Sequence, residues 1–507
     1  MSKNFSRPMY PTSIRRMEKA FRNATKLLKT KLFAPYQEEG VRWLLSRELS
    51  TDNEIKSGFL CDEMGLGKTI QLITLMLGNP KNKTMVICPK SVIPQWENEI
   101  LKFAPYFNTS SSSHDIGKVD IFITNYATFC QETKKRSEKC KKLLRVHWDR
   151  VILDEGHEIR NSGSNTHITI AELKVIHKWV VSGTPIYNSI KDFMALSSFL
   201  GIDPKVAQIF TQRVRDKYLI RRTKEDVSRY NEKLKLPPCH FENVEISMYP
   251  EEEALYSEVF LQAQQEIKQI MKYRKSSGMA AMQVFEWLLR CRQLMIHPDV
   301  YLKGMAIKND HEFTSWEFKS KKTEVLIENI MAHPFEKSLI FCSFIQEMLI
   351  ITKSLLENGV NVCYLDGSLD NGERQQQMKK FRESEEHIVF IIQIKAGGVG
   401  LNLQEATRVY IMSPSWNPAT ELQAIGRSHR TGQQKAVVVK KLIAIPAAAT
   451  PSIEEGIMRL QGHKSVVCAE VLNDERLLEQ IPTKLGKLNK KIQITDIGKL
   501  FSMPKSK

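Results

Sequence analysis

A glycine-rich segment that begins at residue 62 could bind phosphate. It reads DEMGLGKT and is followed by a helix-like run, QLITLML. Glycines let backbone N–H groups turn towards phosphate oxygens, and the N-terminus of the following helix adds a positive dipole. In such a loop the Lys68 ammonium reaches the β- and γ-phosphates of a nucleotide, and the Thr69 hydroxyl holds Mg²⁺. The strict pattern has a glycine where Asp62 stands, so the segment alone also fits a chance turn.

An apolar run that ends in two carboxylates supplies the second element of such a site. Residues 151–157 read VILDEGH, which is typical of a buried strand that ends in polar side chains. Asp154 would hold the Mg²⁺ shell, and Glu155 would polarise the attacking water. A strand that runs into a polar turn is common by itself. Paired with Gly67-Lys68-Thr69 upstream, the two carboxylates favour a nucleotide-hydrolysing site.

Two arginines near the other end of the chain could complete this chemistry. Residues 423–433 read QAIGRSHRTGQ, so Arg427 and Arg430 are three residues apart and are predicted to lie on one face of a helix. An arginine supplied to a γ-phosphate raises the rate of hydrolysis by about 10³ to 10⁵. The alternative is a surface helix that carries two solvated arginines.

Two long segments in which short β-branched runs alternate with helical patterns would position these residues. The first extends from about Phe33 to Thr223, and its strand candidates are 84–88, 119–124, 150–153 and 179–182. The second follows a helical middle, and its strand candidates are 338–342, 361–365, 388–392, 409–412 and 437–443. This alternation predicts an α/β fold with a parallel sheet in each segment.

The segment between the two sheets has a helical pattern. After Pro250 the sequence places five apolar side chains on one helical face: Leu255, Val259, Ala263, Ile267 and Ile270. We expect an all-helical insertion there. The predicted organisation is a basic N-terminal tail (1–30), a first lobe (31–230), a helical insertion or linker (231–320), a second lobe (321–475) and a basic C-terminal tail (476–507).

Composition excludes several classes of protein. The chain has 507 residues, of which 42% are hydrophobic and 26% charged, as in soluble globular proteins of several domains. No stretch approaches the roughly 18 apolar residues of a membrane span. The nine cysteines include no C-x-x-C pair, which argues against both a disulfide framework and a zinc site and favours a reducing compartment.

The positive charge gathers at the two ends of the chain. The formal net charge is +17; residues 1–35 hold nine Lys or Arg against one Glu, and residues 481–507 hold seven Lys against one Asp. Basic tails on a nearly neutral middle indicate a polyanionic partner, most often nucleic acid. The tails could also be solubilising or nuclear-import segments, or disordered charge without a defined partner. A further basic cluster at 134–145 is typical of a solvated helix face.

In combination, these motifs resemble the Swi/Snf-type group of superfamily-two helicases, from about Phe33 to Leu472. DEMGLGKT is the phosphate loop of that family as it stands, which accounts for Asp62 in place of a glycine. The DEGH box, in place of the more widespread DEAH, is similar to the repair-linked and termination-linked branch. The resemblance implies two RecA-like lobes with helical insertions between them, and ATP and Mg²⁺ as cofactors.

The resemblance also implies roles for residues elsewhere. In the family's first motif, which resembles Pro35-Tyr36-Gln37, the glutamine reads adenine. The implied nucleotide contacts are Gln37, Asp62, Glu63, Met64, Gly65, Leu66, Gly67, Lys68 and Thr69, with Thr69 and Asp154 on the metal. The implied catalytic groups are Asp154, Glu155, Arg427 and Arg430. The residues implied to contact DNA or to couple it to hydrolysis are Lys90, Gln95, Trp96, His157, Ser182, Thr184, Gly397, Gly398 and Gln423.

Three positions depart from the family pattern. Gln393 stands where a serine or threonine usually contacts a DNA phosphate, Ser415 replaces the first residue of a common tryptophan pair, and Gly426 replaces a frequent aspartate. The first of these puts one DNA contact in question. None of them removes an expected catalytic group.

The resemblance implies a DNA-dependent ATPase that moves along double-stranded DNA and displaces bound proteins, with nucleosomes or transcription complexes as partners and the nucleus as its location. The chain shows no RING finger or other accessory domain, and in this it resembles the family members of insect baculoviruses. That resemblance would place the chain in a host nucleus. One alternative is a strand-separating helicase. Another is a DNA-binding regulator that does not hydrolyse ATP, but that class predicts losses among Lys68, Asp154, Glu155 and Arg430, and all four are present.

Overall fold

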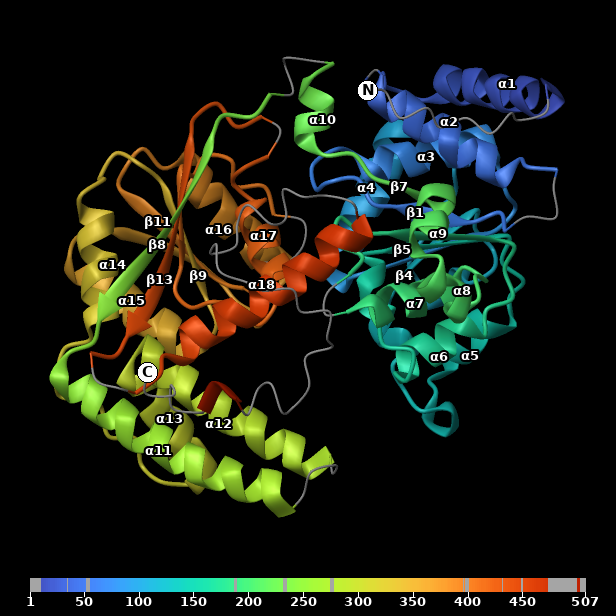
Figure 1. The fold of residues 1–507 in the computed structure, drawn as a ribbon. Helices are drawn as coiled ribbons and strands as arrows, with labels where there is room; N and C mark the ends of the chain where they lie inside the picture. Colours follow the sequence, from blue (N-terminus) through green and yellow to red (C-terminus); the bar gives the residue numbers. More distant parts are fainter. Residues whose placement is uncertain are drawn as a thin grey trace. The chain divides into compact units, whose positions relative to one another are not determined.

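The computed structural model describes most of the chain as two compact units. The described residues are 11–33, 35–51, 55–186, 189–230, 235–273, 278–394, 396, 401–430, 432–447, 450–472 and 499–501. Unit 1 comprises the described residues up to Lys235 together with 470–472, and unit 2 comprises those from Leu236 to Ala469 together with 499–501 (Figure 1). Each unit has its own sheet.

The sheet of unit 1 has seven strands in the order β3-β4-β2-β5-β6-β1-β7, and every neighbouring pair is parallel. The strands are β1 (Gly58–Leu60), β2 (Thr84–Cys88), β3 (Thr109–Ser110), β4 (Ile121–Asn125), β5 (Arg150–Asp154), β6 (His177–Val181) and β7 (Leu219–Ile220). The central strands β2 and β5 are buried along almost their whole length because helices cover a parallel sheet on both faces. This confirms the parallel α/β fold that the sequence predicted.

Ten α-helices are described in unit 1. They are α1 (Pro11–Leu27), α2 (Tyr36–Glu48), α3 (Lys68–Gly78), α4 (Ile93–Phe103), α5 (Glu138–Arg145), α6 (Asn165–Ala171), α7 (Ile190–Phe199), α8 (Pro204–Ile209), α9 (Thr211–Tyr218) and α10 (Lys224–Ser228). A buried ion pair ties α2 to the sheet, since Arg150 of β5 donates through Nε and Nη2 to the Glu48 carboxylate at 2.7 and 2.5 Å. The indole of Trp179 donates to the same carboxylate at 2.8 Å.

The N-terminal segment differs from the expected basic tail. From Pro11 it forms α1, which buries Met17, Phe21 and Ala24 and packs against α2 and α3 (Figure 1). Proline is well tolerated in the first turn of a helix, so Pro11 can begin this helix. Residues 1–10, and all of the expected C-terminal tail except 499–501, lie outside the described residues.

The sheet of unit 2 has six strands in the order β10-β11-β9-β12-β13-β8, again parallel throughout. The strands are β8 (Cys239–Ser247), β9 (Ser338–Cys342), β10 (Asn361–Leu365), β11 (Ile388–Gln393), β12 (Arg408–Ile411) and β13 (Val437–Ile445). Because β8 pairs along its whole length with β13, the expectation of an all-helical insertion over 231–320 is wrong at its start. This stretch is the edge strand of the second sheet.

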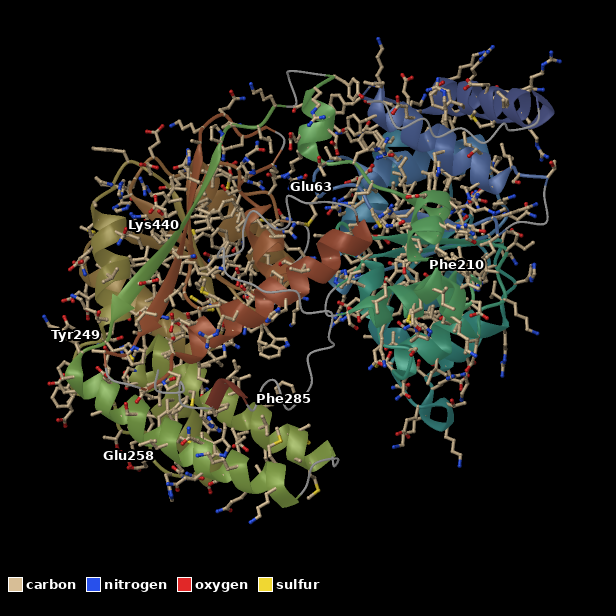
Figure 2. All side chains as sticks on the ribbon, in the orientation of Figure 1. Glu63, Phe210, Tyr249, Glu258, Phe285 and Lys440 are labelled. Atoms are coloured by element: carbon tan, nitrogen blue, oxygen red, sulfur yellow. The ribbon has the colours of Figure 1, made fainter. Side chains whose placement is uncertain are left out.

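The middle of that insertion is helical, as predicted, whereas residues 310–320 at its end are not. It contains α11 (Pro250–Tyr273), α12 (Gly278–Ile296) and α13 (Pro298–Asn309). Val259, Ala263 and Ile267 of α11 are buried in one cluster with α12, and Leu255 and Ile270 pack against that cluster. Tyr249, labelled in Figure 2, donates its hydroxyl to Glu324 at 2.5 Å and so links the start of α11 to α14.

The remaining helices of unit 2 flank its sheet. They are α14 (Lys321–Met331), α15 (Ile345–Glu357), α16 (Asn371–Glu383), α17 (Pro418–Ile425) and α18 (Ile453–Leu472). None of the helices in the described part of the chain is long and apolar enough to cross a membrane.

Candidate active site

The strand order of unit 1 brings three sequence motifs to one edge of its sheet. β5, β6 and β1 are neighbours, and the register pairs Asp154 with Val181 and Val181 with Leu60. The glycine-rich loop follows β1, the DEGH box follows β5, and the SGTP segment follows β6. Because these strands are parallel, the three motifs emerge side by side at the carboxyl edge.

The loop between β1 and α3 has the backbone of a phosphate cradle. Gly65 and Gly67 have φ values of 89° and 73°, in the left-handed region that glycine adopts without strain. A Cβ on Gly67 would lie 2.4 Å from Nε2 of Gln37, so a larger residue there would displace the Gln37 amide as well as strain the backbone. The helix α3 begins immediately afterwards at Lys68, and its N-terminus adds to the positive potential of the loop.

The loop wraps around the Lys68 ammonium. Nζ of Lys68 donates to the backbone oxygens of Asp62 at 2.9 Å and of Glu63 at 3.4 Å. Thr69, the second residue of α3, lies beside it. Both side chains are half-buried at the mouth of the loop, where a phosphate oxygen can replace a carbonyl as the partner of the ammonium.

The side chain of Asp62 anchors the loop and does not face a ligand. It is fully buried, and its carboxylate accepts from Nε of Arg222 at 2.9 Å, from Nη2 of Arg222 at 2.5 Å and from Nε2 of Gln71 at 3.0 Å. Arg222 also donates to the backbone oxygen of Tyr36. We therefore correct the expected nucleotide contact of the Asp62 side chain to a structural ion pair, which sequence analysis missed.

Three other expected nucleotide contacts also lie against this loop. Gln37 is 3% exposed and donates through Nε2 to the Leu66 backbone oxygen at 3.2 Å. Glu63, labelled in Figure 2, accepts the backbone N–H of Lys224 at 2.9 Å. A Cβ on Gly183 would lie 3.1 Å from Cγ of Met64, so the loop also packs against the SGTP segment.

The carboxylate of Asp154 is held from two sides. Trp96 donates its indole N–H to Oδ2 of Asp154 at 2.8 Å, and the Tyr126 hydroxyl donates to the backbone oxygen of Asp154 at 2.7 Å. Burial, together with the charge of neighbouring Glu155, raises the pKa of Asp154 to about 6, while the Trp96 bond acts in the opposite direction. A bound cation would offset both effects and favour the ionised form.

Glu155, His157 and Ser182 form a polar cluster beside Asp154. Glu155 has a φ of 51°, an uncommon left-handed conformation for a residue other than glycine. Oε2 of Glu155 lies 3.3 Å from Nδ1 of His157 and accepts from Oγ of Ser182 at 3.4 Å. His157 Nδ1 and Ser182 Oγ are 3.1 Å apart. The DEGH and SGTP segments are thus in direct contact.

The expected coupling residues differ in exposure. Thr184 donates its backbone N–H to Oγ of Ser182 at 3.2 Å. Lys90 and Gln95 are exposed, and Gln95 donates to Glu99 at 2.8 Å. Trp96 is only 1% exposed, so its expected direct contact with DNA is wrong. Its indole instead fixes Asp154, because the helix α4 turns that face towards the end of β5.

The arginine motif lies in unit 2 and is not helical. The helix α17 contains Gln423 and ends at Ile425, so Arg427 and Arg430 lie in the turn that follows it, contrary to the expected shared helix face. Ser428 donates to the Ala406 backbone oxygen at 2.6 Å, and Arg430 donates through Nη1 to the Leu401 backbone oxygen at 3.2 Å. Gly397 and Gly398 lie outside the described residues.

Two protein families match the chain over these same segments. The SNF2-related domain matches residues 36–300, more than half of the chain, and the helicase conserved C-terminal domain matches residues 321–432. The chain belongs to the SNF2-related family. This confirms the family that its motifs resembled, and with it the assignment of the chain as an ATP-hydrolysing enzyme of the helicase type.

Curated relatives cover most of the chain. A probable global transactivator of Orgyia pseudotsugata multicapsid polyhedrosis virus is 28% identical and covers 80% of the chain and 85% of the relative. A putative ATP-dependent helicase/translocase of Bacillus subtilis is 30% identical over 89% of the chain, and human DNA excision repair protein ERCC-6 is 28% identical over 88%. The chain spans 50% and 33% of the length of the last two.

Two solved structures also align with the chain. Both are of the Sulfolobus solfataricus SWI2/SNF2 ATPase core, one of them in complex with dsDNA. They are 25% and 24% identical, cover 90% and 95% of this chain and 98% and 96% of their own, and have TM-scores of 0.38 and 0.37.

Proposed function

We propose that the chain is a DNA-dependent ATPase that moves along duplex DNA and displaces proteins bound to it. The observation that carries this proposal is the contact of three motifs at the edge of one sheet: the phosphate loop, the DEGH box and the SGTP segment. A motor must transmit hydrolysis at its phosphate site to its substrate. Direct contact between that site and the SGTP segment provides a route for this.

ATP would bind with its phosphates on the loop that ends in α3. The backbone N–H groups around Gly65 and Gly67 would cradle the phosphate oxygens, and Lys68 would move from its loop carbonyls to the β- and γ-phosphates. Gln37 lies against the loop and is our candidate for adenine recognition. Its amide is already bonded to the Leu66 backbone oxygen, so a shift of the loop on ATP binding would reach it directly.

The donor set at the loop fits Mg²⁺. The Thr69 hydroxyl and the Asp154 carboxylate are hard oxygen ligands, and Mg²⁺ in such sites takes few protein ligands because substrate phosphates and water supply the rest. The raised pKa of Asp154 marks a buried carboxylate that a cation would stabilise. When bound, the ion neutralises charge on the phosphates.

Hydrolysis would use the side chains that the DEGH box presents. Glu155 would orient the attacking water and accept its proton. Its carboxylate contacts both His157 and Ser182, so a change of charge at Glu155 alters the hydrogen bonds of the SGTP segment. We propose that Arg427 and Arg430 of unit 2 stabilise the charge of the transferring phosphate, as the order of motifs implies.

Duplex DNA is the proposed track. Relatives include an ATP-dependent helicase/translocase and a DNA excision repair protein, and one related core has been solved in complex with dsDNA. Binding should run mainly through phosphates, with strong salt dependence and little sequence preference. A nuclear location, in a host cell if the chain is viral, would follow from this partner, with nucleosomes or transcription complexes as the displaced proteins.

The proposal is tested by ATP hydrolysis measured without nucleic acid and with single-stranded DNA, duplex DNA or RNA, with Lys68→Ala as the blank. We expect strong stimulation by duplex DNA that the Lys68→Ala variant loses. A forked duplex in the same reactions should stay paired, and its unwinding would favour a strand-separating helicase. No hydrolysis from folded protein that binds ATP would favour the DNA-binding regulator.

A further inference from the structure

The outer face of α1 carries a straight row of cations. Arg15, Lys19, Arg22 and Lys26 are all exposed and recur at intervals of three or four residues. At 3.6 residues per turn they fall within an arc of about 60°, so they form one stripe along the helix. We call these four residues the α1 stripe.

Among the described residues, no acidic side chain pairs with the α1 stripe. Glu18 is the acidic residue of α1; it flanks the stripe, and its carboxylate accepts from Nε of Arg42 at 3.0 Å. The four formal positive charges of the stripe therefore form no ion pair within the described part of the chain. Surface charges of this kind usually alternate in sign or pair along a helix.

The stripe is also fixed in place by the opposite face of α1. Met17, Phe21 and Ala24 are each at most 6% exposed, and the Arg42 guanidinium lies 3.8 Å from the centre of the Phe21 ring. A Cβ on Gly78 of α3 would lie 3.2 Å from the backbone oxygen of Ala20, so the two helices approach closely. The cations are thus held in one row before any partner binds.

We propose that the α1 stripe binds the phosphate backbone of duplex DNA, as a contact separate from those that the family motifs make. The helix lies outside residues 36–300, the part that matches the SNF2-related domain. The stripe spans roughly 16 Å from Arg15 to Lys26, which is the axial length over which one DNA strand carries about five phosphates. The choice of DNA as the polyanion rests on the proposed function, whereas the row of charges does not.

The geometry of α1 disfavours a lipid surface as the partner. A helix that lies on a membrane inserts its apolar face, and here that face is buried against α2 and α3. An acidic protein segment would satisfy the same charges. It is therefore an arm of the test.

The test replaces the α1 stripe in the full chain with Arg15→Gln, Lys19→Gln, Arg22→Gln and Lys26→Gln together. Glutamine keeps good helix propensity and removes the charge. Binding to a labelled duplex is followed by fluorescence anisotropy without nucleotide, over a series of KCl concentrations. We expect the slope of log affinity against log salt to fall by roughly 3 to 4, and affinity at low salt to fall about tenfold or more.

A matched control removes four other exposed cations of unit 1, with Lys118→Gln, Lys134→Gln, Lys142→Gln and Arg145→Gln. An equal loss of affinity and slope in this control would mean that net charge alone acts, and would overturn the proposal. Unchanged binding in the stripe variant would overturn it too. The proposal would also be overturned if the stripe variant lost binding to polyglutamate while it kept its binding to DNA.

The proposed DNA contact of the stripe and the proposed motor function can fail separately in these experiments. If duplex DNA fails to stimulate hydrolysis by the unaltered chain while the stripe variant still loses salt slope, the motor assignment fails and the DNA contact stands. Thermal unfolding of the stripe variant checks the fold, because the substituted side chains are exposed and should leave the midpoint nearly unchanged.

Discussion

At the scale of single residues, Asp154 depends on a neighbour that sequence analysis assigned to another task. The indole N–H of Trp96 reaches its carboxylate at 2.8 Å across 58 residues of sequence. A hydrogen bond to a charged group is worth about 1.5–3 kcal/mol, more than an average neutral bond. Trp96 is therefore a positioning residue for the carboxylate that we propose to bind Mg²⁺.

The first prediction replaces Trp96 with phenylalanine, which keeps a buried ring but removes the N–H. We expect kcat for ATP hydrolysis with duplex DNA to fall by roughly 10-fold or more, because a misplaced carboxylate supports the reaction less well. We also expect a higher Mg²⁺ concentration for half-maximal activity, with KM for ATP little changed. Steady-state rates over a magnesium titration measure both effects.

A matched control is Trp148→Phe. Trp148 is equally buried, and its indole N–H donates to the Leu143 backbone oxygen at 2.9 Å and not to a residue of the DEGH box. The Trp148→Phe variant should be less stable than the unaltered chain, and its ATP hydrolysis should depend on magnesium in the same way. Equal magnesium curves for the two variants would contradict the positioning role of Trp96.

A second prediction concerns Glu347, which is 1% exposed in unit 2. Burial raises the pKa of this carboxyl from 4.5 to about 7, although it accepts the backbone N–H groups of Ser343 and Phe344, and Lys322 and Arg292 lie near enough to act against the shift. The folded state thus favours the protonated form. The contribution of the protonated Glu347 carboxyl to the free energy of unfolding is fully present below about pH 4.5. It is lost as the pH rises through about 7, and the loss is up to about 3 kcal/mol.

Glu347→Gln should remove this pH dependence while keeping the oxygen that caps α15. We expect the variant to gain stability over the unaltered chain above pH 7 and to match it near pH 4.5. Hydrogen exchange of the β9 amides across that range reports on unit 2 alone. Glu357→Gln, at the exposed end of the same helix, should leave the pH profile unchanged.

At the scale of elements, the sequence predicted those parts of the fold that its own pattern determines. The runs that became β2, β5 and β9 are continuous and apolar, and parallel strands of that kind are buried on both faces. The glycine-rich loop and the strand that ends in two carboxylates together predicted a nucleotide-hydrolysing site. Nothing local predicted the pairing of Asp62 with Arg222, because 160 residues separate the two.

The two wrong predictions at this scale have different causes, one local and one distant. β8 reads CHFENVEIS, and only Ile246 in it is fully buried, so an edge strand of this kind shows no apolar run. The turn that holds Arg427 and Arg430 is stabilised by Ser428 and Gln433, which bond the Ala406 backbone oxygen. Those contacts come from a distant segment and override the helical spacing of the two arginines.

The third prediction tests whether α1 is part of unit 1 or merely an appendage. Phe21→Ala should lower the free energy of unfolding of unit 1 by about 3–4 kcal/mol, because it removes a buried ring from the contact with Arg42. Denaturant unfolding measures the loss. Ile14→Ala on the same helix removes a side chain that is 41% exposed and should cost less than about 0.5 kcal/mol. Equal effects would contradict the docking of α1.

At the scale of the whole molecule, the groups assigned to ATP hydrolysis are divided between two units. The phosphate loop, Asp154 and Glu155 belong to unit 1, whereas Arg427 and Arg430 belong to unit 2. We propose that unit 1 binds the nucleotide and supplies the base, and that unit 2 contributes to the chemical step alone. Loss of Lys68 should weaken nucleotide binding, and loss of an arginine should slow the chemical step without weakening binding.

The fourth prediction follows from this division. Arg430→Ala should bind a fluorescent ATP analogue within a few-fold of the unaltered chain, yet hydrolyse ATP with duplex DNA about 10³-fold or more slowly, because the arginine acts on charge that develops in the transition state. Lys68→Ala should lose both properties. Arg382→Ala is the matched control: Nη2 of Arg382 donates to the Asn402 backbone oxygen at 2.8 Å, as Arg430 donates to that of Leu401. If Arg430→Ala hydrolyses ATP as fast as Arg382→Ala, unit 2 does not supply the arginine, and the chemistry is complete within unit 1.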